Sequence, residues 1–266
     1  KIYVGNMNNI SLNDDSFIEA FLIDLTCKCM KIAMLDYEKK VFYKKDGTVI
    51  TKTDSKINDL IIKELNKFFP KIPIISEEKS FKKTTFLEEK YWIIDPIDGT
   101  SSFARGADNY TINLALIENG IPKLGVIGNP PSDTIWYGNS RNSFVKRKGS
   151  KVNLEVSKFN DKNIRVLLST NADKDTMNLV KNINNKSIER YSSSIKFCRI
   201  AEGKADVYPR LQSINKWDIA AGDAILRSAG GSLLNTDGTN YKYNFKSEKT
   251  GPFIATSSIK FLKYFK

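Results

Sequence analysis

Two stretches near the start of the chain carry apolar residues at every third or fourth position, which is the spacing that gathers them on one face of a helix. The second stretch ends at Pro70, because proline cannot continue a helix. A later stretch is rich in alanine and is followed by Gly230-Gly231, a usual helix C-cap. The predicted helices cover residues 16–37, 55–69, 173–184, 193–201 and 218–229.

Short runs rich in β-branched and aromatic residues lie between these helices and predict strands. Three of the runs are separated by turns at Asn119-Gly120 and Asn129-Pro130-Pro131 and are typical of an antiparallel meander. The predicted strands cover residues 72–75, 91–94, 111–117, 123–127, 134–137, 165–168 and 207–208, with two more within 144–156. The pattern indicates an α+β chain of alternating sheet and helix layers.

Composition narrows the class of protein. The 266 residues are 41% hydrophobic, which is ample for a buried core. No run approaches the roughly 18 apolar residues of a membrane-spanning helix, and the N-terminus lacks a secretory pattern. Three cysteines are too few for a disulfide framework, and Cys27 and Cys29 would diverge on a helix, which favours packing over metal binding. We expect a cytoplasmic protein, and leave open peripheral contact with the inner face of the membrane.

The charges and the absence of histidine restrict the chemistry. A net charge of +12 suggests nucleic-acid binding, but the lysines are scattered and form no dense basic block, so a lysine-rich surface is favoured. Such a surface would also steer a small polyanionic substrate. The chain has no histidine, which excludes Ser-His-Asp and Cys-His catalysis and histidine-ligated zinc. Chemistry would depend on carboxylates, hydroxyls, amines or a bound metal ion.

A group of oxygen ligands follows the strand predicted at 91–94. Asp95 and Asp98 flank a Pro96-Ile97 turn, and the Thr100 hydroxyl and the Ile97 carbonyl are close in sequence. These are the hard oxygens that Mg²⁺ prefers. If a helical turn opens here, the amides of Gly99, Thr100 and Ser101 would face an anion.

The same residues are also what an ordinary turn uses, so other carboxylates decide between the two interpretations. Glu77 leaves the strand predicted at 72–75 and would reach the same sheet edge if the two strands are neighbours. Asp218 opens the alanine-rich helix and Asp54 precedes the helix predicted from residue 55, where each could instead be a plain N-cap.

Three segments together resemble the lithium-sensitive phosphatases of the inositol monophosphatase type. They are WIIDPIDGT at 92–100, WDIAAG at 217–222 and Glu77-Glu78, and the resemblance runs from about residue 46 to 251. It implies a layered αβαβα sandwich of the inositol monophosphatase/fructose bisphosphatase type. Residues 1–155 would be a metal-binding lobe with the catalytic motif. Residues 156–266 would supply the substrate pocket and the last metal ligand within one compact catalytic unit.

The resemblance also implies a mechanism, in which a metal-activated water attacks phosphorus in line with the leaving oxygen. Two or three Mg²⁺ ions would be bound. Asp54, paired with Thr100, would orient the attacking water. The implied metal ligands are Glu77, Asp95, the Ile97 carbonyl, Asp98, Thr100 and Asp218.

The second half of the chain suggests a substrate. Residues 193–198, 201–206 and 208–210 resemble the 3'(2'),5'-bisphosphate nucleotidases of the CysQ type, which act on adenosine 3',5'-bisphosphate, a by-product of sulfur metabolism. Arg210 stands where inositol monophosphatases have a glutamate, and its planar cation suits a second phosphate. An arginine engaged in a surface salt bridge is the equal alternative. The implied substrate-binding residues are Gly99, Thr100, Ser101, Ser193, Ser194, Lys196 and Arg210.

Two other functions stay open. One is an inositol or sugar phosphatase on the same scaffold, and the other is a basic nucleic-acid-binding protein with an inactive phosphatase fold. We expect a small bisphosphate nucleotide as partner and no nucleic acid. The sequence does not determine the oligomeric state.

Overall fold

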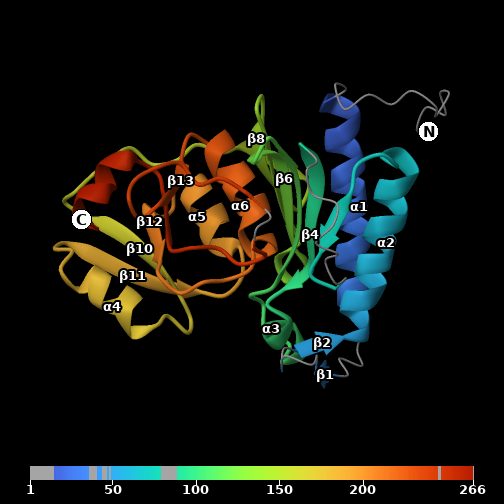
Figure 1. Ribbon diagram of the computed structural model, residues 1–266, viewed down its shortest axis with the longest axis horizontal. Coiled ribbons are helices and arrows are strands. Elements are labelled where there is room, and N and C mark those ends of the chain that lie inside the picture. The colour runs from blue at the N-terminus through green and yellow to red at the C-terminus, as the bar shows by residue number, and fades with distance from the viewer. Residues whose placement is uncertain are drawn as a thin grey trace.

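Helices and sheets alternate in five layers in the computed structural model (Figure 1). The predicted end of the first helix at Tyr37 lies outside the described residues. None of the helices in the described ranges is long and apolar enough to cross a bilayer. The structure describes residues 15–35, 41–43, 47, 49–78, 89–244 and 247–265.

The larger sheet has seven strands and contains the predicted meander, because β5, β6 and β7 pair as antiparallel neighbours. The one parallel pair joins β3 to β4, so both of these strands end at the same edge. In spatial order the strands are β3 (Ile74–Ser76), β4 (Lys90–Asp98), β5 (Thr111–Glu118), β6 (Ile121–Asn129), β7 (Thr134–Asn139), β8 (Ser143–Arg147) and β9 (Ser150–Asn153).

Helices α1 (Asp15–Leu35) and α2 (Lys52–Phe68) cover one face of this sheet. Helix α2 begins three residues before the predicted start. Its N-cap is Thr51, whose backbone N–H donates to the Asp54 carboxylate at 2.8 Å while the Asp54 N–H donates back to the threonine hydroxyl at 3.4 Å. Asp54 therefore lies in the first turn of the helix, where the sequence analysis had placed it just before the helix.

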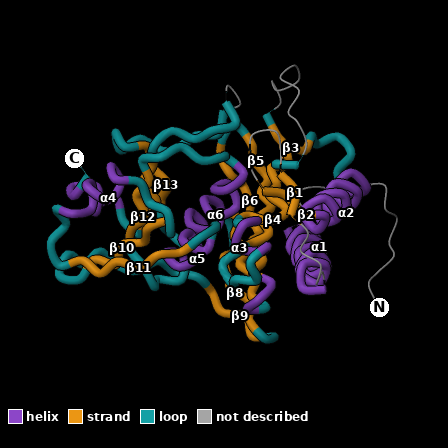
Figure 2. Tube along the Cα trace, turned by 90° about the horizontal axis from the view of Figure 1, so that it is seen from below, coloured by secondary structure: helices purple, strands orange, loops and turns teal. Residues whose placement is uncertain are grey.

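Helices α5 (Ile195–Ala201) and α6 (Trp217–Ser228) lie between the two sheets and are buried on both sides. Figure 2 shows them as the central layer, with the seven-stranded sheet and α1 on one side and the second sheet on the other. Small residues let α6 pack this closely, since Ala220, Ala221 and Ala224 are almost inaccessible to solvent. The predicted C-cap is confirmed, because α6 ends at Ser228 and Gly230 has a φ of 95°.

The smaller sheet has five strands, and α4 (Lys174–Lys181) with the 3₁₀ helix η3 (Ile259–Tyr264) covers its outer face. The order of layers is therefore αβαβα, as the resemblance implied. In spatial order the strands are β11 (Lys186–Tyr191), β10 (Ile164–Ser169), β12 (Val207–Arg210), β14 (Phe253–Thr256) and β13 (Ser232–Asn235). We propose that the two sheets correspond to the lobes 1–155 and 156–266.

Several elements were not predicted. Strands β11, β13 and β14 are among them. The others are the hairpin of β1 (Val41–Tyr43) and β2 (Val49–Thr51), the 3₁₀ turn η2 (Pro130–Ser132) and the 3₁₀ helix η3. The helical turn considered near Gly99 is the short helix α3 (Thr100–Ala104).

Candidate functional site

A bulge near the end of β4 brings Asp95 and Asp98 to one face of the sheet. Both were predicted in a turn after the strand, but the pairing with β5 continues to Asp98, with an irregular register between the two aspartates. Pro96 has no N–H to donate to a neighbouring strand, which favours a bulge there. Side chains three apart in a regular strand point to opposite faces, and the extra residue of a bulge removes that difference.

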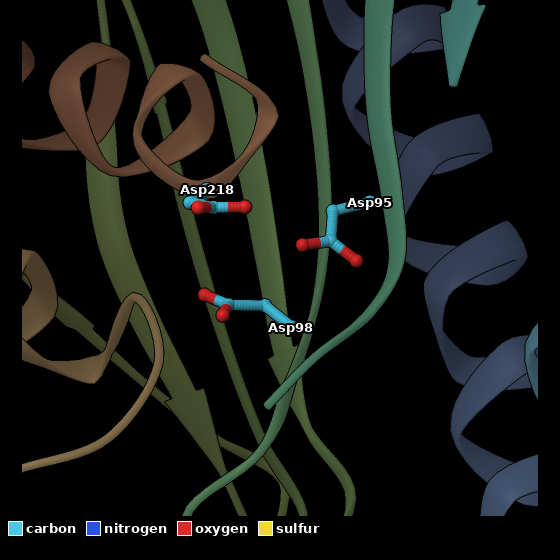
Figure 3. A group of neighbouring side chains, drawn as sticks. All are labelled: Asp95, Asp98 and Asp218. Carbon is cyan, nitrogen blue, oxygen red and sulfur yellow. The ribbon is translucent and has the colours of Figure 1, made fainter. Parts of the chain in front are cut away.

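Asp218 reaches the same point from the first turn of α6. Figure 3 shows the side chains of Asp95, Asp98 and Asp218 directed toward a common space, and one carboxylate oxygen from each lies within 4.8 Å of the others. The plain N-cap interpretation of Asp218 is wrong, because the N-cap is Lys216. The Asn215 N–H donates to Asp218 Oδ2 at 3.0 Å and helps to hold the carboxylate in place.

Glu77 lies near these three aspartates, and its charge acts on Asp95 and Asp218. It follows β3, and its N–H donates to the carbonyl of Ile94 in β4 at 3.3 Å, so the predicted neighbourhood of the two strand ends is confirmed. Burial raises the pKa of Asp95 well above its usual value, and the charges of Glu77, Asp98 and Asp218 and a hydrogen bond with Glu77 raise it further. Burial and the charges of Asp98 and Glu77 likewise raise the pKa of Asp218 well above its usual value.

These residues fit a divalent cation. Asp95 is 1% exposed, and its Oδ2 atom is buried without a hydrogen-bond partner among the described residues. Several carboxylates crowded together repel one another when ionised, and a bound cation removes that cost. All the donors are hard oxygens, which suit Mg²⁺.

Asp54 and Thr100 meet beside this group, as the resemblance implied. The Thr100 hydroxyl lies 3.2 Å from Asp54 Oδ1 and 3.0 Å from the Ile97 carbonyl oxygen, so it can donate to either. Asp54 is fully buried, and burial raises its pKa although hydrogen bonds from Thr51 and Thr100 act in the opposite direction. A buried carboxyl of raised pKa next to a hydroxyl can accept and release a proton.

A pocket of about 410 Å³ opens from the carboxylates toward the smaller sheet, a volume within the range of small-molecule sites. Arg210 lies on its wall, and its guanidinium donates to Ser169 Oγ at 2.5 Å and to the Gln212 carbonyl at 3.0 Å. The pocket is lined by Asp98, Ser169, Thr170, Asn171, Ser192, Ser193, Lys196, Phe197, Tyr208, Arg210, Gln212, Ile214 and Asp218.

The other residues predicted to bind substrate have different positions. Ser193 and Lys196 line the pocket, and the Lys196 ammonium donates to the carbonyls of Tyr191 and Ser193 at 3.1 and 2.6 Å. Ser194 is buried outside the pocket wall, and its hydroxyl can donate to Asp98 Oδ2 at 2.7 Å. This position favours a role in orienting Asp98 over direct contact with a substrate.

The segment at the start of α3 lies beside the pocket lining. Gly99, Thr100 and Ser101 are not among the residues of the wall, and Ser101 is exposed. Gly99 is the N-cap of α3 and has a φ of 91°, a conformation that glycine adopts without strain. Their contact with a phosphate stays a prediction.

The polar residues at the end of β10 and just after it were not predicted. Ser169, Thr170 and Asn171 stand directly after the apolar run of that strand, and Gln212 follows β12. Because β10 and β12 are parallel, their carboxyl ends meet at one edge of the sheet. The polar run after the apolar residues of β10 was the signal that could have identified this wall, whereas Leu211 stands between β12 and Gln212.

Comparison with known proteins places the chain among related phosphatases. Residues 14–260 match the model of the inositol monophosphatase family. The 3'(2'),5'-bisphosphate nucleotidase CysQ of Buchnera aphidicola subsp. Acyrthosiphon pisum is 38% identical over 209 residues, which cover 78% of each chain. The fructose-1,6-bisphosphatase/inositol-1-monophosphatase of Thermotoga maritima is 32% identical over 76% of this chain and 75% of its own.

A solved structure agrees with the sequence relatives. CysQ from Bacteroides thetaiotaomicron, a bacterial member of the inositol monophosphatase family, superposes with a TM-score of 0.79 at 26% identity. The match covers 92% of this chain and 98% of that one. The layered fold and the family resemblance are thereby confirmed.

Proposed function

Since the chain belongs to the inositol monophosphatase family and is a phosphoric monoester hydrolase of the 3'(2'),5'-bisphosphate nucleotidase type, we propose that it removes the 3'-phosphate of adenosine 3',5'-bisphosphate with the help of Mg²⁺. The product would be AMP. The observation that carries this proposal is the position of Arg210, on the wall of the pocket that Asp98 and Asp218 also line.

The carboxylates and two further oxygens would hold two or three ions. Bound Mg²⁺ lowers the pKa of water and stabilises negative charge on a leaving oxygen. The chain itself supplies the proton path, because the Thr100 hydroxyl is within hydrogen-bonding distance of Asp54 Oδ1 and can relay a proton from the attacking water to it. The proposed metal-binding residues are Glu77, Asp95, the Ile97 carbonyl, Asp98, Thr100 and Asp218.

Arg210 would bind the phosphate that does not react. Within the described part of the chain its guanidinium is held by neutral partners, the Ser169 hydroxyl and Gln212, so its charge is not neutralised by a salt bridge. The electrostatic influence of Arg210 extends to Asp218, whose pKa it acts to lower. An arginine held in place with its charge free is suited to a second phosphate group, which inositol monophosphate lacks.

The substrate assignment is tested by comparing phosphate release from adenosine 3',5'-bisphosphate, inositol 1-phosphate and fructose 1,6-bisphosphate at equal enzyme and Mg²⁺. We expect the nucleotide to have the highest kcat/KM. Faster release from inositol 1-phosphate or fructose 1,6-bisphosphate would refute the assignment and favour the activities named for the Thermotoga maritima relative.

Replacement of Arg210 tests the second-phosphate role directly. Arg210→Ala should raise KM for the bisphosphate by on the order of 10- to 100-fold and leave KM for a monophosphate nearly unchanged, because only the former loses a charge-assisted contact. Arg141→Ala is the matched control, since that arginine is exposed and pairs with Asp15 on the surface. An equal rise in KM for both substrates would contradict the role.

The alternative function, a basic nucleic-acid-binding protein with an inactive phosphatase fold, predicts an activity that does not depend on Mg²⁺ or on Asp95. Its RNA binding would fall steeply with salt and would survive both removal of Mg²⁺ and the Asp95→Asn change. We expect Asp95→Asn to abolish phosphate release while the fold persists, because it removes one ligand oxygen's charge without changing the volume. Full turnover by Asp95→Asn would refute the metal assignment.

A further inference from the structure

Asn113 and Ser194 lie behind Asp98, on the side away from the pocket, and both are only 1% exposed. Asn113 belongs to β5 and stands opposite Asp95 in the register of β4 and β5. Ser194 is the residue before α5. Their side chains therefore approach Asp98 from the sheet and from the central helix layer.

The two side chains share one oxygen of Asp98. The Asn113 amide group lies 3.2 Å from Asp98 Oδ2 and 2.7 Å from Ser194 Oγ, so its two N–H bonds can serve both. The Ser194 hydroxyl lies 2.7 Å from the same Oδ2 and 2.8 Å from the backbone carbonyl of Asp218. The hydroxyl has one hydrogen, so it can donate to either of these two oxygens but not to both, and it accepts from the Asn113 amide.

We propose that Asn113 and Ser194 are positioning residues that direct Oδ1 of Asp98 to the divalent cation. When the serine donates to Oδ2, that oxygen accepts from both side chains, which favours Oδ1 as the oxygen that binds the metal. Outer residues that orient ligands in this way commonly contribute to metal affinity. The inference rests on the proposed metal-dependent function.

The amide of Asn113 is difficult to explain by packing alone. It interrupts the apolar run of β5 between Ile112 and Leu114, and burying an amide is costly unless its groups are hydrogen-bonded. Its Oδ1 atom has no hydrogen-bond partner among the described residues. The opposite orientation of the amide would place a carbonyl oxygen against Asp98 Oδ2, so the carboxylate determines which way the amide faces.

The test is binding of Mn²⁺ and of Mg²⁺ to the purified chain without substrate, measured by titration calorimetry. Asn113→Leu and Ser194→Ala should each weaken metal binding by roughly 10- to 100-fold. The double variant should have nearly the same metal affinity as the single variant that binds metal less tightly, because both side chains act on the same oxygen of Asp98. At saturating metal, KM for the substrate should stay close to that of the wild type.

Asn139→Leu is the matched control. Asn139 is also a buried asparagine of the larger sheet, but its side chain holds the turn after β7 by accepting from the N–H groups of Arg141 and Asn142. This variant should lose stability and keep the metal affinity of the wild type. Ser194→Ala decides the question if Asn113→Leu does not fold.

The outcomes separate the two proposals. Metal affinities within about twofold of the wild type in folded Asn113→Leu and Ser194→Ala would overturn the positioning role alone. A wild-type chain that binds neither ion would refute the metal-dependent function, and the positioning role with it.

Discussion

Gly125 in β6 determines how closely α6 lies over the larger sheet. A Cβ atom at this position would be 2.5 Å from the carbonyl oxygen of Ala221 and 2.8 Å from Cβ of Ala224. Ordinary contacts begin at 3.4 Å, so a Gly125→Ala change requires the helix to move away by about 0.9 Å. The atoms in the way belong to the helix backbone and a short side chain, which cannot rotate aside. Asp218 lies one turn earlier on the same helix and should move with it.

Two measurable losses follow from this shift. Overpacking of a core usually costs about 1–3 kcal/mol, so the free energy of unfolding in urea should fall by that amount. Misplacement of a catalytic group by about 1 Å costs on the order of 100-fold in rate, so kcat/KM for phosphate release should fall to that extent. Metal affinity, measured by calorimetry, should fall as well.

Two other glycines provide the controls. Gly128 lies on the same strand but faces α1, where its Cβ would be 2.6 Å from Thr26 Cγ2. Gly128→Ala should therefore lose comparable stability and retain turnover. Gly251→Ala should change neither quantity, because nothing lies within 4 Å of the added atom. A Gly125→Ala protein that is destabilised yet turns over at the wild-type rate would show that the height of α6 does not position Asp218.

Three further predictions concern other parts of the chain. Burial raises the pKa of Asp206, but hydrogen bonds from Arg165 and Ser157 outweigh this and hold it below the usual 3.8. Asp206→Asn should therefore lower the free energy of unfolding in urea at pH 7. The difference from the wild type should vanish as the pH falls below 3.8 and Asp206 of the folded wild type becomes protonated. A difference that stays constant with pH would contradict this. Thr51→Ala should cost about 1 kcal/mol of stability and lower kcat with little change in KM, because it removes the hydroxyl that caps the Asp54 N–H at the start of α2 and that donates to the Asp54 carboxylate; an unchanged kcat would exclude the link. Millimolar lithium should inhibit phosphate release, and full activity in its presence would contradict the family resemblance.

The helices were the most predictable part of the fold. Helices α1 and α2 each bury one apolar face, and such a face repeats along the sequence with a period that a single chain reveals. Helix α6 is buried on both sides, and it was its alanine content and the glycines after it that predicted it. The predicted start of α2 was three residues too late. Thr51 caps the helix through a reciprocal pair of hydrogen bonds with Asp54, and the polar residues of such a cap look the same in sequence as those of a loop.

The missed strands lack a local signature. Strand β11 forms the edge of the smaller sheet and is largely exposed, so its sequence KSIERY is dominated by polar residues. Strand β14 has only four residues, all buried, and pairs with β12 and β13, which are distant in sequence. Such strands are stabilised by partner strands elsewhere in the chain, so a short stretch of sequence does not include the residues that stabilise them.

The acidic residues of the site were visible individually, and the family signatures indicated their grouping. Their geometry was not visible. Asp95 and Asp98 share a face because β4 has a bulge where the sequence predicts a turn. The arrangement of Ser194 and Asn113 behind Asp98 joins positions that are 81 residues apart, and no spacing along the chain predicts it.

The sequence by itself determined the class of chemistry. Without histidine, chemistry was limited to carboxylates, hydroxyls, amines or a bound metal ion, and the aspartates at a strand end and a helix start favoured the metal. The tertiary structure decided which oxygens converge, how closely α6 approaches the sheet, and that Arg210 stands on the wall of the same pocket. The type of each residue determines its charge and the metals that it can bind. The distances between the carboxylates depend instead on how the layers pack, and the strands and helices of these layers come from distant parts of the chain.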